Sequence, residues 1–238
     1  MCITIKEEVA YCDLWNAIPP QKPVLLWDTC GLLDCLRIVC RFNKSYLDNY
    51  SYVAERIIAG DVISVIPATV RQELSDNYAE VCDEASREQG KAIQAALKLM
   101  ELFGSAEQDA LTVKRTLTAA DIVARSKAIL HGILEKSYVV KDDILFRDFA
   151  HMRIMAKLPP AHVKQEYKDC HIWGCVTNCA RIRPDMDRKV FFLTSNTADY
   201  SAEGCKGEVA ELIKHDCDSN KIDFSFNIGA LRARLSTI

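Results

Sequence analysis

Short uninterrupted runs of apolar residues occur at four places in this chain, separated by longer stretches with helical periodicity. A continuous apolar run predicts a strand that is buried on both faces, as in a parallel sheet covered by helices. The pattern therefore predicts four buried strands, at residues 23–28 (PVLLWD), 61–67 (DVISVIP), 189–194 (KVFFLT) and 222–226 (IDFSF).

Apolar residues at helical spacing fill most of the chain between these runs. Gly60 ends one predicted helix, and Pro159 and Pro160 stop another. Gly104 and Ser105 interrupt a long helical region between the second and third strands. We expect helices at residues 31–42, 45–59, from 68 to this break, 118–138, 141–157, 169–182 and 209–215, a loop at 194–204, and a closing helical tail.

Strands that alternate with helices predict an α/β fold, here a three-layer sandwich with a mostly parallel central sheet. No repeat, low-complexity tract or flexible linker divides the chain. We therefore expect a single domain over residues 1–238, with a helical insertion at about 76–140.

The composition indicates in which cellular compartment the protein resides and how it could bind nucleic acid. With 238 residues and 49% hydrophobic content, the chain can bury a full core. Its net charge of −3 gives no overall attraction to nucleic acid, so phosphate binding requires local basic patches. The odd count of 11 cysteines and the absence of a signal-like or membrane-spanning stretch predict free thiols in a cytoplasmic protein that does not enter a membrane.

The residues that point to chemistry are four acids, each next to an apolar run: Asp28, Glu73, Asp169 and Asp199. Residues at the ends of parallel strands converge at the edge of an open sheet, where ligands bind. Four carboxylates there would repel one another unless a cation neutralised them. Oxygen-only ligation suits Mg²⁺ or Mn²⁺, which can activate water for phosphodiester cleavage.

Each acid also has an ordinary explanation. Asp28 and Asp169 could be helix N-caps, Glu73 could lie on a solvated helix face, and Asp199 could be a turn residue. The joint arrangement of all four, rather than any one of them, favours a metal site.

The order of these motifs resembles the PIN-like nuclease family, through WDTCGLLD, PATVRQEL, KDCHIW and LTSNTADY. The stretch from RDFAHMRIM to KDCHIW also resembles the subgroup with a proline-containing loop before the third acid. In that subgroup an arginine and a lysine recur where this chain has Arg153 and Lys164. Lys168 departs from the family pattern, which more often has a small residue before the third acid.

The resemblance implies a metal-dependent endoribonuclease with an α/β PIN-like fold. Asp28, Glu73, Asp169 and Asp199 would be the catalytic, metal-binding residues for Mg²⁺ or Mn²⁺. Residues expected to position the phosphate or the last acid are Thr194, Ser195, Asn196, Lys164, Lys168 and Arg153. The partner is nucleic acid, with RNA favoured. The sequence leaves open a homo-oligomer or an inhibitory partner.

Several alternatives remain open from the sequence. A PIN-like fold could bind or scaffold nucleic acid without catalysis, or cleave DNA in a defence system. A zinc site would use Cys170, His171, Cys175 and Cys179, and Arg125 to His131 (RSKAILH) resembles part of a metal-independent ribonuclease. Further candidates for nucleic-acid contact are the cations Arg181, Arg183, Arg188 and Lys189 and the aromatic residues Trp173 and Tyr200.

Overall fold

The central element is a parallel sheet whose strands come from the whole length of the chain. The structure, a computed structural model, describes residues 4–41, 44–102 and 121–238. Within these residues, six strands form one sheet in the order β1-β4-β3-β2-β5-β8, and every neighbouring pair is parallel. The strands are β1 (Glu7–Val9), β2 (Val24–Trp27), β3 (Ile63–Pro67), β4 (Tyr138–Val140), β5 (Val190–Leu193) and β8 (Ile222–Ser225).

The four predicted strands are all present, and the predicted α/β sandwich is confirmed. Two strands of this sheet were not predicted, β1 and β4. Each has only three residues, which is too short for an apolar run or an alternation to be distinctive. Tyr138 was expected to end a helix, whereas it pairs with Val65 of β3 and Glu7 of β1.

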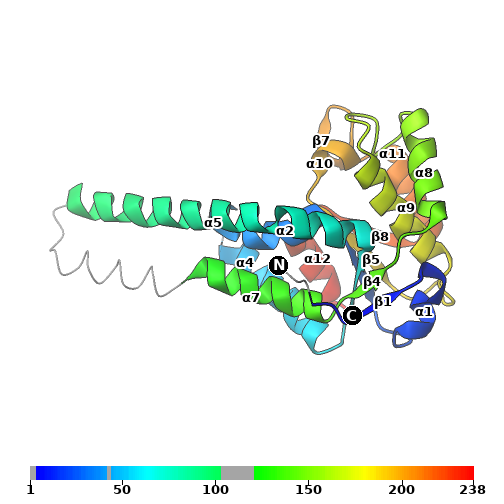
Figure 1. The fold of residues 1–238 in the computed structure, drawn as a ribbon, viewed down its shortest axis with the longest axis horizontal. Coiled ribbons are helices and arrows are strands. Elements are labelled where there is room, and N and C mark those ends of the chain that lie inside the picture. Colours follow the sequence, from blue (N-terminus) through cyan, green and yellow to red (C-terminus); the bar gives the residue numbers. More distant parts are fainter. Residues whose placement is uncertain (1–3, 42–43, 103–120) are drawn as a thin grey trace.

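Helices cover both faces of this sheet (Figure 1). One layer contains α2 (Thr29–Leu36), α4 (Lys44–Ile58), α7 (Ile122–Glu135) and α12 (Ile228–Leu235), and the other contains α8 (Ile144–Met155), α9 (Tyr167–Arg181) and α11 (Glu211–Asn220). The other α-helices of the described residues are the short α1 (Leu14–Ala17), α3 (Ile38–Arg41) and α10 (Thr197–Tyr200) and the long α5 (Ala68–Leu102), and a 3-10 helix covers Tyr11–Asp13.

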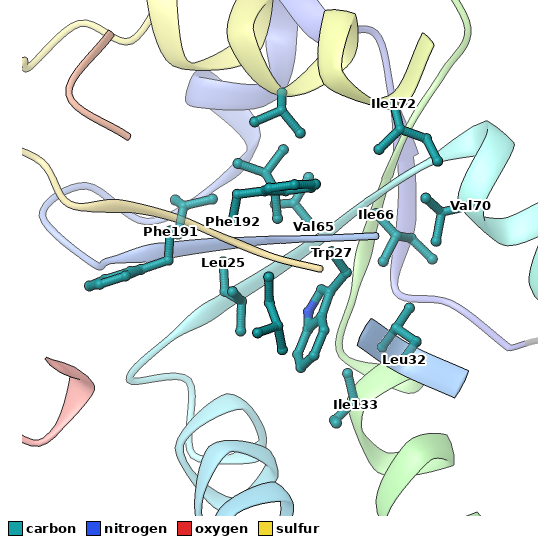
Figure 2. Close-up of a cluster of buried hydrophobic side chains, with 14 of the residues drawn as sticks. Leu25, Trp27, Leu32, Val65, Ile66, Val70, Ile133, Ile172, Phe191 and Phe192 are labelled. Atoms are coloured by element: carbon teal, nitrogen blue, oxygen red, sulfur yellow. The ribbon is translucent and has the colours of Figure 1, made fainter. Parts of the chain in front are cut away.

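The core forms where strand side chains meet these layers. Figure 2 shows Trp27 pointing from β2 toward Ile133 and Leu32, while Ile172 of α9 lies on the other side of the sheet. The Trp27 indole is fully buried and donates a hydrogen bond to Ser64 Oγ at 2.9 Å. A satisfied indole of this kind adds packing area to the sheet without leaving a polar atom unpaired.

The long helix α5 extends well beyond the sheet, and α7 runs beside part of it while also packing on α2 and α4 (Figure 1). Helix α5 contacts β3, β4 and α9, and the end of α5 that follows β3 lies beside the sheet (Figure 1). The expected break at Gly104 and Ser105 lies outside the described residues. In the described part of the chain, no helix is both long and apolar enough to cross a membrane.

The segment after β5 differs from the expected loop. It contains α10 and an antiparallel hairpin of β6 (Ser201–Ala202) and β7 (Cys205–Val209). Gly204 and Gly207 adopt positive φ angles of 72° and 90° in this hairpin, a conformation that favours glycine. Helix α11 begins at Glu211, slightly later than expected, and continues to Asn220.

Candidate functional site

Four carboxylates from separate parts of the chain line one pocket at the carboxyl edge of the sheet. Asp28 follows β2 directly, Glu73 lies in the second turn of α5 after β3, and Asp169 lies in the first turn of α9. Asp199 lies in α10, shortly after β5. All four side chains line a pocket of about 710 Å³. The acids singled out in the sequence are thus brought together.

The sheet topology explains why the pocket forms here. From β2 the chain continues to β3 and β4 on one side, and it returns to β5 and β8 on the other. Open parallel sheets bind ligands at this kind of switch point. Gly31 lets α2 start close to β5, because a Cβ at this position would lie 2.9 Å from the carbonyl oxygen of Leu193.

Two threonines fix the first two acids. The backbone N–H of Thr29 donates to Asp28 Oδ1 at 2.7 Å, and the Thr194 hydroxyl donates to Asp28 Oδ2 at 2.5 Å. The Thr29 hydroxyl donates to Glu73 Oε2 at 2.5 Å, so one residue holds both carboxylates. Thr29 was not singled out in the sequence, although its place directly after the first acid was the available signal.

Asn196 holds the other two acids. Its side-chain NH₂ donates to Asp199 Oδ2 at 2.8 Å and to Asp169 Oδ2 at 3.3 Å. Its backbone N–H donates to Thr194 Oγ1 at 3.0 Å, which connects it to the residue that holds Asp28. Of the residues expected to position the phosphate or the last acid, Asn196 thus contacts the last acid, Asp199, whereas Thr194 contacts the first, Asp28.

Burial, together with the proximity of the other acids, raises the pKa values of Asp28 and Asp169. The pKa of Asp28 is raised to about 6, mainly by burial. Repulsion from Glu73 and Asp199 also raises this pKa, whereas the hydrogen bond from Thr194 lowers it. Burial raises the pKa of Asp169 to about 8, with added repulsion from Asp28, Asp199 and Glu73. Carboxyl groups that resist ionisation in this way bind protons or another cation at neutral pH.

The pocket fits a hard divalent cation, although its ligand set is not already closed. Among the described residues, Asp199 Oδ1 is buried without a hydrogen-bond partner, and it belongs to a pocket-lining carboxylate. No three His, Cys, Asp or Glu side chains in this part of the chain are arranged as a complete ligand group. Six of the eight oxygens of the four acids contact threonine, asparagine or lysine donors. Ligation therefore requires these side chains to rearrange.

Of the remaining predicted site residues, some line the pocket and others lie outside it. Lys164 and Lys168 both line the pocket, and Lys168 Nζ lies 3.2 Å from Glu73 Oε1. Ser195 lies in the turn between β5 and α10, where its carbonyl oxygen accepts from the N–H of Thr197. Tyr167, which the sequence did not suggest, also lines the pocket with an exposed ring. It is better placed for contact with a base than the buried aromatic residues are.

Arg153 lies outside this pocket. Its guanidinium is buried, forms an ion pair with Asp216 of α11 and donates to the carbonyl oxygen of Pro159 at 2.5 Å. It also stacks on Phe149, 4.8 Å from the ring centre, and the Trp173 indole donates to the same Asp216 carboxylate at 2.7 Å. Its position does not support the expected phosphate contact. Arg153 instead ties the proline-containing loop to α11.

We expect Arg153→Met to lower the free energy of unfolding by about 2 kcal/mol, because it leaves the mostly buried Asp216 carboxylate without its cation. Mn²⁺ affinity, measured below the unfolding transition, should stay at the wild-type value. Denaturant unfolding followed by circular dichroism measures the first quantity and isothermal titration calorimetry the second. If the Arg153→Met protein were as stable as wild type but bound metal or nucleic acid more weakly, Arg153 would have to be counted among the binding residues after all.

A buried histidine joins the helices that carry two of the acids. His171, two residues after Asp169 in α9, lies with Nδ1 2.9 Å from the hydroxyl of Thr69, one turn before Glu73 in α5. Its Nε2 lies 2.7 Å from Asp142 Oδ1. The Nδ1 contact therefore holds α9 against α5, the helix that carries Glu73, while the Nε2 contact ties α9 to the segment between β4 and α8.

The other cations and aromatic residues proposed for nucleic-acid contact lie elsewhere. Arg188 is buried at the opposite edge of the sheet, donating to the carbonyl oxygens of Lys22 and Pro19, and Arg183 donates to that of Asn220. The expectation that these two arginines steer phosphates is wrong, because their donors are used by the backbone. Trp173 and Tyr200 are likewise fully buried in the core.

The two alternative sites find little support in the contacts. Every cysteine whose side chain the structure describes is a free thiol, and Cys175 and Cys179 lie buried with their sulfur atoms 3.9 Å apart. His171, needed for the zinc alternative, has both nitrogens in other contacts. His131 of the RSKAILH segment stacks on Tyr78 of α5 and does not line the pocket.

Comparison with known proteins agrees with this geometry. A family model described as a PIN domain matches residues 25–200, a range that includes all four acids and most of the sheet. No curated protein and no solved structure gives a significant match to the chain.

Proposed function

This chain belongs to the PIN-domain family, and we propose that it is a metal-dependent endoribonuclease that uses Mg²⁺ or Mn²⁺. The observation that carries the proposal is the convergence of Asp28, Glu73, Asp169 and Asp199 on one pocket, with a buried Asp199 oxygen that accepts no hydrogen bond from the described residues. Such a site suits a divalent cation better than it suits four uncompensated charges.

In this proposal the four acids hold the metal, and the neighbouring residues keep them in place. When bound, the metal would supply a water of lowered pKa and compensate charge on the phosphate. Thr29 and Thr194 hold Asp28 and Glu73 through donated hydrogen bonds, while Asn196 holds the other two acids. These contacts limit how far the carboxylates must move when the site is filled.

Nucleic acid would approach from the open side of the pocket. Lys164 and Lys168 supply positive charge there, and the exposed ring of Tyr167 supplies a surface for stacking with a base. This local charge suits a protein whose net charge of −3 offers no overall attraction. RNA is preferred over DNA on the family resemblance alone. The free thiols are consistent with our proposal of a cytoplasmic location.

We also propose a domain organisation for the chain and a subgroup within the PIN-domain family. We treat residues 1–238 as a single PIN-like domain with a mostly helical insertion at about 76–140, of which the last residues form β4 of the central sheet. The Arg153 contact with Pro159 supports the subgroup with a proline-containing loop before Asp169. A homo-oligomer or an inhibitory partner remains part of the hypothesis.

The test is a cleavage assay on RNA and DNA oligonucleotides with Mg²⁺, with Mn²⁺ and with EDTA. We expect internal cleavage of RNA with either metal and none with EDTA, because the pocket residues alone provide no activated water. Cleavage of DNA only would favour a nuclease of a defence system. Metal-dependent binding without cleavage of either substrate would favour a binding or scaffold protein.

A further inference from the structure

Lys168 lies in direct contact with the acidic pocket and competes with any cation for one of its oxygens. Its Nζ is 3.2 Å from Glu73 Oε1, and the other oxygen of Glu73 accepts from the Thr29 hydroxyl. Both oxygens of this carboxylate are therefore already in use. Among the ion pairs of the described residues, this is the one that joins a basic side chain to the four acids.

The two partners differ in how firmly they are held. The Glu73 side chain is 17% exposed and anchored by Thr29, whereas the Lys168 side chain is 58% exposed. An exposed lysine is held weakly and can rotate into solvent on its flexible stem. The ion pair can therefore open by movement of Lys168 while Glu73 stays in place.

From this contact, and resting on the proposed metal site, we infer that Lys168 is a built-in counter-cation. It neutralises Glu73 in the metal-free protein and must leave when a divalent cation takes that oxygen. Its charge weakens metal binding in the absence of substrate. Once displaced, Lys168 is free at the pocket opening, where a phosphodiester can bind it.

The inference links metal binding to nucleic-acid binding. A phosphate that draws Lys168 away from Glu73 frees a metal ligand, and a metal on Glu73 frees a phosphate contact. Because binding linkage is reciprocal, each ligand raises the affinity for the other by the same factor. Lys168 would thus favour metal retention on substrate-bound protein, which a small residue at this position cannot do.

The test measures Mn²⁺ affinity by electron paramagnetic resonance, without nucleic acid, in wild type and three variants. Lys168→Gln should bind Mn²⁺ about threefold to tenfold more tightly, the gain expected from losing one competing, partly exposed ion pair. Lys168→Arg keeps the charge and should stay close to wild type. Lys164→Gln is the matched control, because it removes a lysine of the same pocket for which the described residues show no ion pair with the acids.

Salt provides a readout that a purely structural role would not change. The gap between wild type and Lys168→Gln should shrink at high NaCl, since exposed charges are screened. Unchanged or weaker Mn²⁺ binding by Lys168→Gln would overturn the inference, as would an equal gain in Lys164→Gln, which would indicate a general field effect. Wild-type protein that binds no Mn²⁺ would instead overturn the proposed metal site itself.

Discussion

Replacing Asp28 with asparagine is expected to lower metal-dependent RNA cleavage by at least about a thousandfold, which corresponds to about 4 kcal/mol of transition-state stabilisation. Asp28 is nearly fully buried at the centre of the pocket, and the change removes a charged metal ligand without changing its size. The Asn oxygen can still accept from the Thr29 N–H, and the Thr194 hydroxyl can rotate to accept from the new NH₂ group. The fold should therefore be retained.

Single-turnover cleavage at saturating Mg²⁺ measures this loss, and circular dichroism checks the fold. Asp76→Asn is the matched control, because Asp76 lies on the same helix as Glu73 but accepts from Gln72 on an exposed surface outside the pocket. It should cleave at the wild-type rate. Substantial activity in a folded, metal-loaded Asp28→Asn protein would show that Asp28 is not essential to the reaction.

Replacing Asp169 with asparagine is expected to stabilise the metal-free protein at pH 8, by on the order of 3 kcal/mol or about 5–10 °C in Tm. Burial and the other acids raise the pKa of this carboxyl group from 3.8 to about 8, so its ionised form is unfavourable in the folded state. Asparagine removes the charge while its oxygen can still accept from Asn196. If the proposed metal site is correct, this loss of stability is the cost of bringing the four acids together to bind a metal.

The pH dependence follows from the direction of the shift. A folded-state pKa above the unfolded value means that the folded wild type binds the proton more tightly, so its stability relative to the variant falls as pH rises from about 4 to about 8. The two proteins should have similar stability near pH 4 and differ most at pH 8 and above. Thermal unfolding in EDTA across this range measures the difference. If the variant were less stable than wild type at pH 8, this would contradict the claim that the ionised Asp169 carboxylate destabilises the folded protein.

Metal should reverse the order of stability at pH 8 when EDTA is replaced by excess Mn²⁺. Mn²⁺ stabilises the protein that binds it by about 4.1 kcal/mol at a concentration of about 1,000 times Kd, which exceeds the deficit of about 3 kcal/mol. Wild type should gain this stability, while Asp169→Asn should gain little.

The sheet and the four acids could be predicted because their signals are local. Continuous apolar runs such as VLLW in β2 and VFFL in β5 predict buried parallel strands. An acid just beyond such a strand is predicted to lie at the carboxyl edge of the sheet. The short β1 and β4 gave no comparable signal. They exist because neighbouring strands offer hydrogen bonds at the register of Tyr138 and Glu7, which depends on tertiary structure.

The roles of the supporting residues depended on contacts between distant segments. From the sequence, Arg153 and Arg188 were candidate phosphate ligands. In the structure the Arg153 guanidinium is buried against Asp216, and that of Arg188 is buried against backbone carbonyl oxygens. Thr29 became visible as a site residue only when α2 and α5 were placed side by side, because its hydroxyl reaches Glu73 across 44 positions of sequence. Neither outcome can be read from spacing alone.

The most direct measurement is anomalous diffraction from crystals of the protein soaked in Mn²⁺. We expect a manganese peak in the pocket within about 2.5 Å of oxygen atoms from at least two of Asp28, Glu73, Asp169 and Asp199. A crystal that takes up manganese only at other positions, or shows none in the pocket at saturating concentration, would contradict the assignment of these carboxylates as a metal site.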